Sequence, residues 1–210
     1  MKVLLFGATG FTGKAVLPEL LANNHVVTAL VRSKNGVDLK HPNLRVIEGD
    51  VLDQSQINAA MEGQEAVINC LGKNKGSDLN LISSFTNKVI RAMEEKKVSR
   101  LIALSNVGAG DSLKAQPFVF RRILLPTILK WLQDLINDKN VMESMIQKSN
   151  LNWTILRFPK ISEKPSQKRI LISQDGKGLS FSISLKDCTE FIVSQLEDKS
   201  LYFKTPSISN

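Results

Sequence analysis

The stretch GATGFTG, residues 7–13, decides the fold of this chain. It follows the apolar run VLLF at residues 3–6 and precedes a segment with a helical pattern at residues 14–23. Gly7 permits a tight turn, Gly10 lets a pyrophosphate approach the backbone, and Gly13 permits a helix to pack closely on a strand. The stretch therefore predicts a strand, a phosphate-binding turn and a helix, in that order.

The donors of this turn are expected on Thr9, Phe11 and Thr12, through backbone N–H groups and hydroxyls. The N-terminus of the helix adds free N–H groups and the positive end of the helix dipole. A glycine pattern alone is weak evidence, but here it lies between the first strand and the first helix, the context that a dinucleotide site requires. The sequence therefore predicts nucleotide binding.

The end of the second apolar run indicates which nucleotide is bound. An NAD site places an acidic residue about 20 residues after the glycines, whereas an NADP site has an arginine that meets the 2′-phosphate. Here the run ends in VRSK, residues 31–34, and the first acid is Asp38. A guanidinium can grip a phosphate with two hydrogen bonds. We therefore expect NADP(H), with Arg32 and Ser33 at the cofactor; the alternative is a strand that ends in solvent with ordinary basic residues.

Short apolar runs alternate with helical segments along the first 160 residues. The runs are VLLF (3–6), VVTALV (26–31), LRVIE (44–48), EAVINC (65–70), RLIALS (100–105) and WTILRF (153–158). Such β-branched, nearly continuous runs are typical of parallel strands that are covered on both faces. The order predicts an α/β fold with a doubly wound parallel sheet: one NAD(P)-binding Rossmann domain over residues 1–210, with a small C-terminal substrate region.

Helix signals lie between these runs. Asp53 can cap the segment QSQINAAM, which Gly63 ends, and residues 79–97 form an amphipathic pattern. Pro18 falls beyond the first turn of the first helix and predicts a kink there. Residues 116–138 are apolar and interrupted by proline. We expect two short helices over the sheet edge; a lid over a substrate pocket, a subunit contact and a membrane-surface helix are the alternatives.

The pattern changes beyond residue 160. RILIS, the turn QDGKG and LSFSIS, which together span residues 169–184, resemble a β-hairpin. Ser184 with Asp187 then opens a final helix.

Composition and charge narrow the class of protein. A chain of 210 residues with 42% apolar and 23% charged residues is ordinary for a soluble globular domain. The net charge of +8 comes from scattered Lys and Arg, which indicates anionic small molecules and no nucleic acid. We expect no membrane span and no cleavable leader, and hence a cytoplasmic protein. Cys70 and Cys188 lack the spacing of a disulfide framework or a zinc site, so we expect idle thiols and no metal.

Three motifs together resemble the atypical short-chain dehydrogenase/reductase family. They are GATGFTG, EGDVLD at residues 48–53, and KNVMESMIQKSNLNWTILRF at residues 139–158. The likeness is to the single-domain NAD(P)H-binding branch, which includes biliverdin reductase B, flavin reductases and the nitrogen-metabolite-repression regulators. It covers nearly the whole chain. The resemblance implies that Asp50 and Val51 flank the adenine. In such a fold Cys70, Leu71 and Gly72 pass near the pyrophosphate and the nicotinamide ribose.

The catalytic pattern of that family is incomplete here. Standard members join a Ser after strand five to a Tyr-x-x-x-Lys on the next helix. Ser105 and Lys139 match the serine and the lysine, but Leu135 stands where the tyrosine is expected. Tyr202, the only tyrosine, has no lysine four residues later. Leucine has no proton to give, so the usual donor for carbonyl reduction is missing. Ser105 and Asn106 can still bind the nicotinamide or the substrate, or they hold the strand end structurally.

Other titratable residues are weaker candidates to replace the missing tyrosine. His25 and His41 are expected on the adenosine side of the fold, as surface or loop residues. Cys70 as a redox nucleophile is a minor alternative.

These observations favour an NADPH-dependent oxidoreductase that transfers hydride to a conjugated acceptor of the flavin, quinone or bilin type. Such an acceptor spreads the arriving charge and can take its proton from water. We expect the nicotinamide near Ser105, with an apolar acceptor site walled by residues 107–125 and Pro159. The alternative is a catalytically weak NADP(H)-binding redox sensor that acts through a partner. A sugar-nucleotide epimerase ranks third because it needs the absent tyrosine. The oligomeric state stays open.

Overall fold

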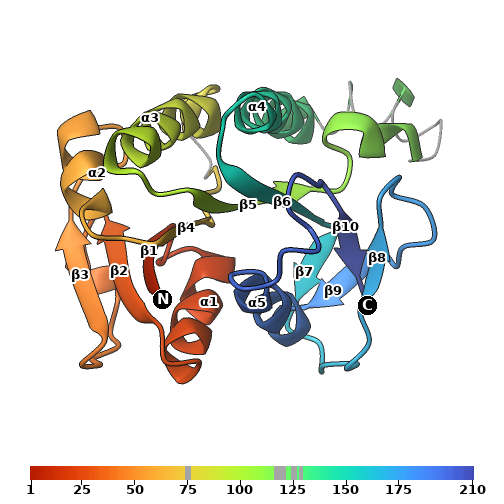
Figure 1. Cartoon of the computed structure of the whole chain (residues 1–210). Coiled ribbons are helices and arrows are strands. Elements are labelled where there is room, and N and C mark those ends of the chain that lie inside the picture. The colour runs from red at the N-terminus through yellow and green to blue at the C-terminus, as the bar shows by residue number, and fades with distance from the viewer. Residues whose placement is uncertain (74–76, 116–121, 124–126, 128–129) are drawn as a thin grey trace.

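The centre of the molecule is a mostly parallel β-sheet. The computed structural model describes residues 1–73, 77–115, 122–123, 127 and 130–210. Its main sheet has eight strands in the order β3-β2-β1-β4-β5-β6-β10-β8 (Figure 1). Neighbouring strands in it run parallel, except that β10 and β8 are antiparallel. The strand order reverses between β1 and β4, which makes that junction the switch point of a doubly wound fold.

The elements have the following bounds. The strands are β1 (Lys2–Phe6), β2 (Val26–Val31), β3 (Leu44–Glu48), β4 (Ala66–Asn69), β5 (Arg100–Asn106), β6 (Asn152–Phe158), β7 (Lys160–Ser162), β8 (Leu171–Ser173), β9 (Ser182–Ser184) and β10 (Ser207–Ser209). The helices are α1 (Phe11–Ala22), α2 (Gln54–Met61), α3 (Leu81–Lys96), α4 (Lys130–Gln147) and α5 (Leu185–Ser194), with the 3₁₀ helices η1 (Lys34–Gly36) and η2 (Gly110–Ala115).

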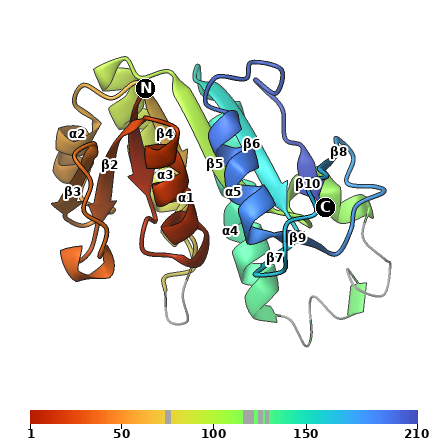
Figure 2. The same cartoon turned by 90° about the horizontal axis from the view of Figure 1, so that it is seen from below.

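Helices cover both faces of the sheet. Helices α2, α3 and α4 lie on one face, and α1 and α5 lie side by side on the other (Figures 1 and 2). Side chains of β1 alternate between the two cores: Val3 and Leu5 face α1 and α5, whereas Leu4 and Phe6 face α2, α3 and α4. This confirms the predicted α/β class with strands that are buried on both sides.

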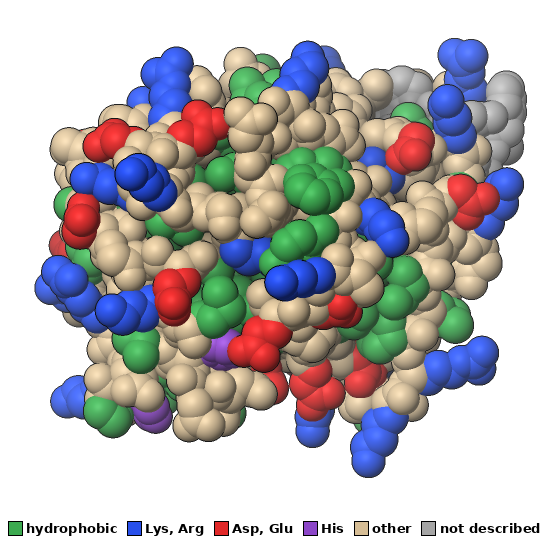
Figure 3. Space-filling view, in the orientation of Figure 1, with side chains coloured by type: hydrophobic (Ala, Val, Ile, Leu, Met, Phe, Trp, Pro, Cys, Tyr) green, Lys and Arg blue, Asp and Glu red, His purple; other side chains and the backbone are tan. Residues whose placement is uncertain are grey.

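Most local signals correspond to the observed elements. The carboxylate of Asp53 caps α2 by accepting hydrogen bonds from the backbone N–H groups of Ser55 and Gln56. Helix α3 ends where Lys97 adopts a left-handed conformation, with φ of 59°. Pro18 lies inside α1, which continues past it to Ala22. Figure 3 shows Lys and Arg spread over one face with acidic side chains between them, in agreement with scattered charge.

The predicted hairpin after residue 160 is wrong. Strand β8 pairs with β10 at the chain end, and β9 pairs in parallel with β7 in a separate two-stranded sheet. Each of these strands has only three residues, so local pattern specifies their pairing weakly and tertiary packing decides it. Of the stretch 116–138, residues 130–138 begin α4; the expectation for residues 116–121, 124–126 and 128–129 lies outside the described residues.

Asp187 ties the C-terminal region together. The Ser184 hydroxyl caps α5 by accepting from the backbone N–H of Asp187 at 3.0 Å, as predicted. The Asp187 carboxylate in turn accepts hydrogen bonds from the hydroxyls of Ser184 and Ser166, the backbone N–H of Gln167 and the side chain of Asn210. One buried carboxylate therefore joins α5, the loop before β8 and the last residue.

We expect Asp187→Asn to lower the free energy of unfolding at neutral pH by about 2 kcal/mol, because buried donors lose a charged acceptor. Burial acts to raise the pKa of Asp187, but hydrogen bonds from Ser166, Ser184, Gln167 and Asn210 hold it below its usual value of 3.8. Stability from a carboxyl with a lowered pKa is present above the unfolded pKa and is lost as the pH falls through the folded pKa. The difference between the two proteins should therefore shrink below about pH 4. Urea unfolding at acidic and neutral pH measures it, and a difference that does not change with pH would contradict the prediction.

Candidate functional site

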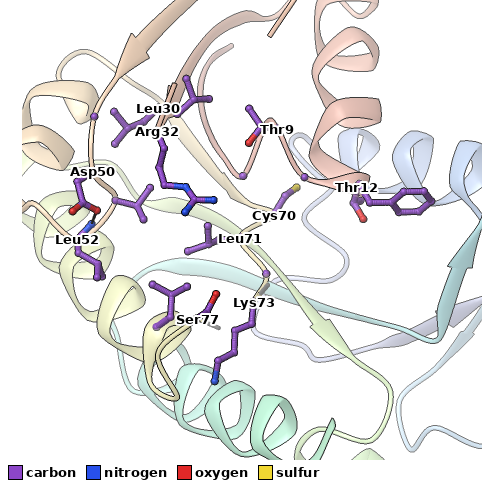
Figure 4. Close-up of a pocket in the computed structure, with 18 of the residues that line it drawn as sticks. Thr9, Thr12, Leu30, Arg32, Asp50, Leu52, Cys70, Leu71, Lys73 and Ser77 are labelled. Atoms are coloured by element: carbon purple, nitrogen blue, oxygen red, sulfur yellow. Dashed lines mark hydrogen bonds between the residues drawn. The ribbon is translucent and has the colours of Figure 1, made fainter. Parts of the chain in front are cut away.

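A cavity of about 740 Å³ opens at the carboxyl ends of β1, β2 and β4 (Figure 4). This is the switch point of the sheet, where open α/β sheets bind their ligands. Its lining residues are Gly7, Thr9, Gly10, Phe11, Thr12, Leu30, Val31, Arg32, Gly49, Asp50, Val51, Leu52, Cys70, Leu71, Gly72, Lys73, Ser77, Asp78 and Leu81.

Most of the residues expected at the cofactor line this cavity. Those that do are Gly7, Thr9, Gly10, Phe11, Thr12, Arg32, Asp50, Val51, Cys70, Leu71 and Gly72; those that do not are Gly13, Ser33, Ser105 and Asn106. Lys139, expected as a catalytic residue, does not line it either. Their individual roles toward a cofactor stay predictions.

The glycine turn is built by close backbone packing. Gly7 has a φ of +78°, which an L side chain rarely adopts, and a Cβ there would lie 2.7 Å from the carbonyl carbon of Cys70. The backbone N–H of Gly10 closes the turn by donating to the Gly7 carbonyl at 2.9 Å. A Cβ on Gly13 would lie 2.1 Å from the Gly7 carbonyl oxygen, so α1 rests directly on the end of β1. Gly13 therefore shapes the cavity without lining it.

The N-terminus of α1 faces the cavity. Gly10 is its N-cap, and no side chain caps the helix with a hydrogen bond. The first turn begins with Phe11 and Thr12, both of which line the cavity. Backbone N–H groups in a first turn have no intrahelical acceptor, and the helix dipole is positive there. This end of the cavity therefore suits a phosphate.

Arg32 supplies a positive charge at the other end. It directly follows β2 and is exposed, and its guanidinium points into the cavity in Figure 4. Asp50 lines the same end from the turn after β3. Ser33 instead precedes η1 as its N-cap and does not line the cavity.

Sequence reasoning missed several lining residues. Leu30, Val31, Gly49 and Leu52 adjoin predicted residues at the ends of β2 and β3, and Lys73, Ser77, Asp78 and Leu81 come from the segment after β4. Their signal was available, because the residues that follow parallel strands gather at one edge of a sheet. Lys73 lines the cavity, but its ammonium group points away from it. Its Nζ lies 3.5 Å from the Asp138 carboxylate and also bonds the Leu79 carbonyl, so it points toward α4 (Figure 4).

The two predicted catalytic residues are turned into the interior. The Ser105 hydroxyl donates to Glu143 Oε1 at 2.6 Å, and the Lys139 ammonium donates to the Leu104 carbonyl at 2.6 Å. Both side chains are buried and do not line the cavity. Their roles toward a substrate stay predictions, and the structure shows what each holds instead: Ser105 joins β5 to α4, and Lys139 joins α4 to the end of β5.

A tyrosine is absent from the cavity. Leu135, at the position of the missing tyrosine, packs against the core between α4 and the sheet. The Tyr202 ring lies 4.3 Å from the guanidinium carbon of Arg100, which begins β5. That is the opposite edge of the sheet from the cavity, so Tyr202 cannot supply a proton there.

None of the remaining titratable candidates is suited to act as a nucleophile or as an acid or base in the cavity. Burial raises the pKa of the Cys70 thiol to about 12, so it is protonated at neutral pH and a poor nucleophile. Burial likewise raises the pKa of Cys188. His25 precedes β2 and His41 precedes β3, so both lie at the amino ends of strands in the half of the sheet that carries Arg32, and neither lines the cavity. His25 is also buried, beside the N-terminal amine.

The described part of the chain shows neither a metal cluster nor a membrane-spanning helix. Within it, no group of three or more His, Cys, Asp or Glu side chains is arranged to hold a metal ion. None of its helices combines the length and apolar character needed to cross a bilayer.

We expect Lys139→Met to change how stability depends on pH. Burial lowers the pKa of Lys139 to about 8 from 10.5, although Glu143 and Asp138 oppose that shift. Between these values the unfolded chain binds more protons than the folded chain, so this lysine makes the free energy of unfolding rise with pH. The variant should lose that rise, as urea unfolding at about pH 8 and about pH 10 would measure. An unchanged slope in the variant would contradict burial of this ammonium.

Comparisons with known proteins agree with this geometry. YwnB of Bacillus subtilis is 26% identical over 178 residues, which cover 84% of this chain and 80% of YwnB. The anaerobilin reductase ChuY from Escherichia coli O157:H7 has the same fold, with a TM-score of 0.83 and 22% identity over 100% of this chain and 97% of ChuY. A short-chain dehydrogenase/reductase from Veillonella parvula in complex with NADP has a TM-score of 0.77 and 18% identity over 100% of this chain and 94% of that chain.

The family model described as NAD(P)H-binding matches residues 7–199, from the first glycine of the turn to beyond α5. The match spans most of the chain and includes the cavity. It confirms the resemblance seen in the sequence motifs: the chain belongs to the NAD(P)H-binding family.

Proposed function

We propose that this protein is an NADPH-dependent oxidoreductase that transfers hydride to a conjugated acceptor of the flavin, quinone or bilin type. The observation that carries the proposal is the lining of the cavity, which includes the glycine turn and Arg32 and contains no tyrosine. NADPH supplies the hydride when it is bound, and the residues of the chain orient it.

Two features at opposite ends of the cavity support the phosphorylated cofactor. The uncapped start of α1 suits the pyrophosphate. The exposed guanidinium of Arg32 suits a 2′-phosphate, because the charge is free to form two parallel hydrogen bonds. No acid directly follows β2, where an NAD site would place one. The Asp50 carboxylate at this end of the cavity accepts a hydrogen bond from the backbone N–H of Leu52.

The hydrogen bonds of Ser105 and Lys139 support the type of acceptor. Carbonyl reduction needs a donor that gives up a proton as the alkoxide forms. Ser105 gives its hydrogen bond to a carboxylate, and Lys139 gives its own to a backbone carbonyl. A conjugated acceptor needs neither group, because it delocalises the new charge until water protonates it. The arrangement therefore favours acceptors of that kind.

Arg32→Gln tests the choice of cofactor. We expect its Kd for NADPH to rise about tenfold or more while the Kd for NADH stays nearly unchanged, because only the 2′-phosphate loses a charged partner. Isothermal titration calorimetry measures both constants. Arg45→Gln is the matched control, since Arg45 is exposed on the neighbouring strand β3 but does not line the cavity. Equal weakening of NADPH and NADH by Arg32→Gln would contradict recognition of the phosphate.

Turnover tests the reaction. Purified protein should oxidise NADPH when FMN, menadione or biliverdin is added, with loss of the nicotinamide absorbance as the measurement. Failure with all three would count against the reductase. Unequal affinity for NADPH and NADP⁺ would then favour the redox sensor, because a ligand shifts a conformational equilibrium only through differential binding.

A further inference from the structure

The 3₁₀ helix η2 is anchored to the sheet by an ion-pair network. Arg157, on β6, is buried, and its Nε and Nη2 donate to the two carboxylate oxygens of Glu143 at 3.1 and 2.6 Å. Its Nη1 donates to Oδ1 of Asp111 in η2. Arg157 thus bonds a buried carboxylate on α4 and an exposed carboxylate on η2 at the same time. The Asp111 side chain is 63% exposed, against 3% for Glu143.

The backbone of η2 is shaped to fit this network. Gly110 has a φ of +56°, and a Cβ there would lie 2.2 Å from Nη2 of Arg157. Its N–H donates to the Asn140 side chain of α4 at 2.7 Å. On the other side, Gly176 in the turn after β8 packs against η2, so that a Cβ there would lie 3.3 Å from Cβ of Ser112. Contacts from α4, β6 and that turn therefore converge on η2.

The place of η2 in the fold suggests what this network is for. The cavity runs from Arg32 across the glycine turn to Cys70–Lys73 at the end of β4. A dinucleotide with its phosphorylated ribose at Arg32 and its pyrophosphate at α1 continues from β4 toward β5, the next strand of the sheet. Helix η2 comes shortly after the end of β5, and Val107 between them donates to the Phe158 carbonyl of β6. Helix η2 therefore follows the strand toward which the nicotinamide end of the cofactor would extend.

We propose that Asp111 is a positioning residue for the acceptor: by bonding Arg157 it holds η2 as a fixed wall of the acceptor site. This inference rests on the proposed reductase function. Asp111 does not line the cofactor cavity, so the proposal gives it no part in cofactor binding. The Arg157–Glu143 pair remains when Asp111 is changed, so the buried guanidinium keeps a counter-charge and the fold survives.

Steady-state kinetics of Asp111→Asn test the inference, with FMN and menadione as acceptors. We expect the KM for the acceptor to rise about fivefold while kcat changes less than about twofold, because the wall is loosened and the reacting groups are untouched. The Kd for NADPH should stay unchanged. Asp111→Glu should recover most of the lost acceptor affinity, because it restores the carboxylate.

Glu62→Gln is the matched control. Glu62 is 72% exposed and pairs with Lys96 at 3.0 Å, where α2 and α3 end. Neither residue lines the cavity, so the kinetics of Glu62→Gln should equal those of the wild type. Hydrogen exchange adds a readout that needs no turnover. Amides of residues 107–115 should exchange faster in Asp111→Asn than in the wild type, while those of residues 7–13 should not.

The outcomes separate the two proposals. If the wild type oxidises NADPH and Asp111→Asn has the same KM for the acceptor, this inference is overturned. The proposed reductase function is then unaffected. Unchanged exchange in residues 107–115 overturns this inference too. Wild-type protein that turns over none of FMN, menadione and biliverdin overturns both, because no acceptor is then left to position.

Discussion

The contact of Gly13 with the carbonyl oxygen of Gly7 is the constraint on which the rest of the site depends. With no Cβ in the way, α1 rests on the end of β1, and a methyl group would have to come within 2.1 Å of that oxygen. The same turn brings Gly7 against the backbone of Cys70 at the end of β4. Close packing at these two points aims the uncapped helix start into the switch point of the sheet, where it serves as an anion site.

Charges are divided between the cavity and the interior. Arg32 is exposed in the cavity, where a ligand can reach it at little cost in desolvation. Lys139, Glu143 and Arg157 are buried, and each bonds a partner within the chain. Buried charges are expensive unless they are paired, and they contribute little net stability when they are. Their concentration at the carboxyl ends of β5 and β6 fits a role in holding neighbouring segments in place.

Ser105 and Lys139 match the family's catalytic pattern in sequence, but their side chains do not point into the cavity. The motif positions of Ser105 and Lys139 match those of catalytic residues, yet both side chains turn toward protein acceptors. The missing tyrosine fits that arrangement, because Leu135, which stands at its position, packs against the apolar core and has no hydroxyl. The residues that line the cavity can bind a cofactor but include no tyrosine to donate a proton. The reaction proposed here therefore uses an acceptor that water can protonate.

The sequence by itself determined strands β1 to β6, the caps of α2 and α5 and the glycine turn, because apolar runs, Asp53 before a helix and glycines at fixed offsets act within a few residues. It also indicated the cation at the end of β2. Tertiary structure alone decided the pairing of β8 with β10 and the bond of Asp111 to Arg157 across 46 positions. The physical reason is that three-residue strands and long-range ion pairs carry no local signal. Their partners are chosen only when helices and chain ends pack on the finished sheet.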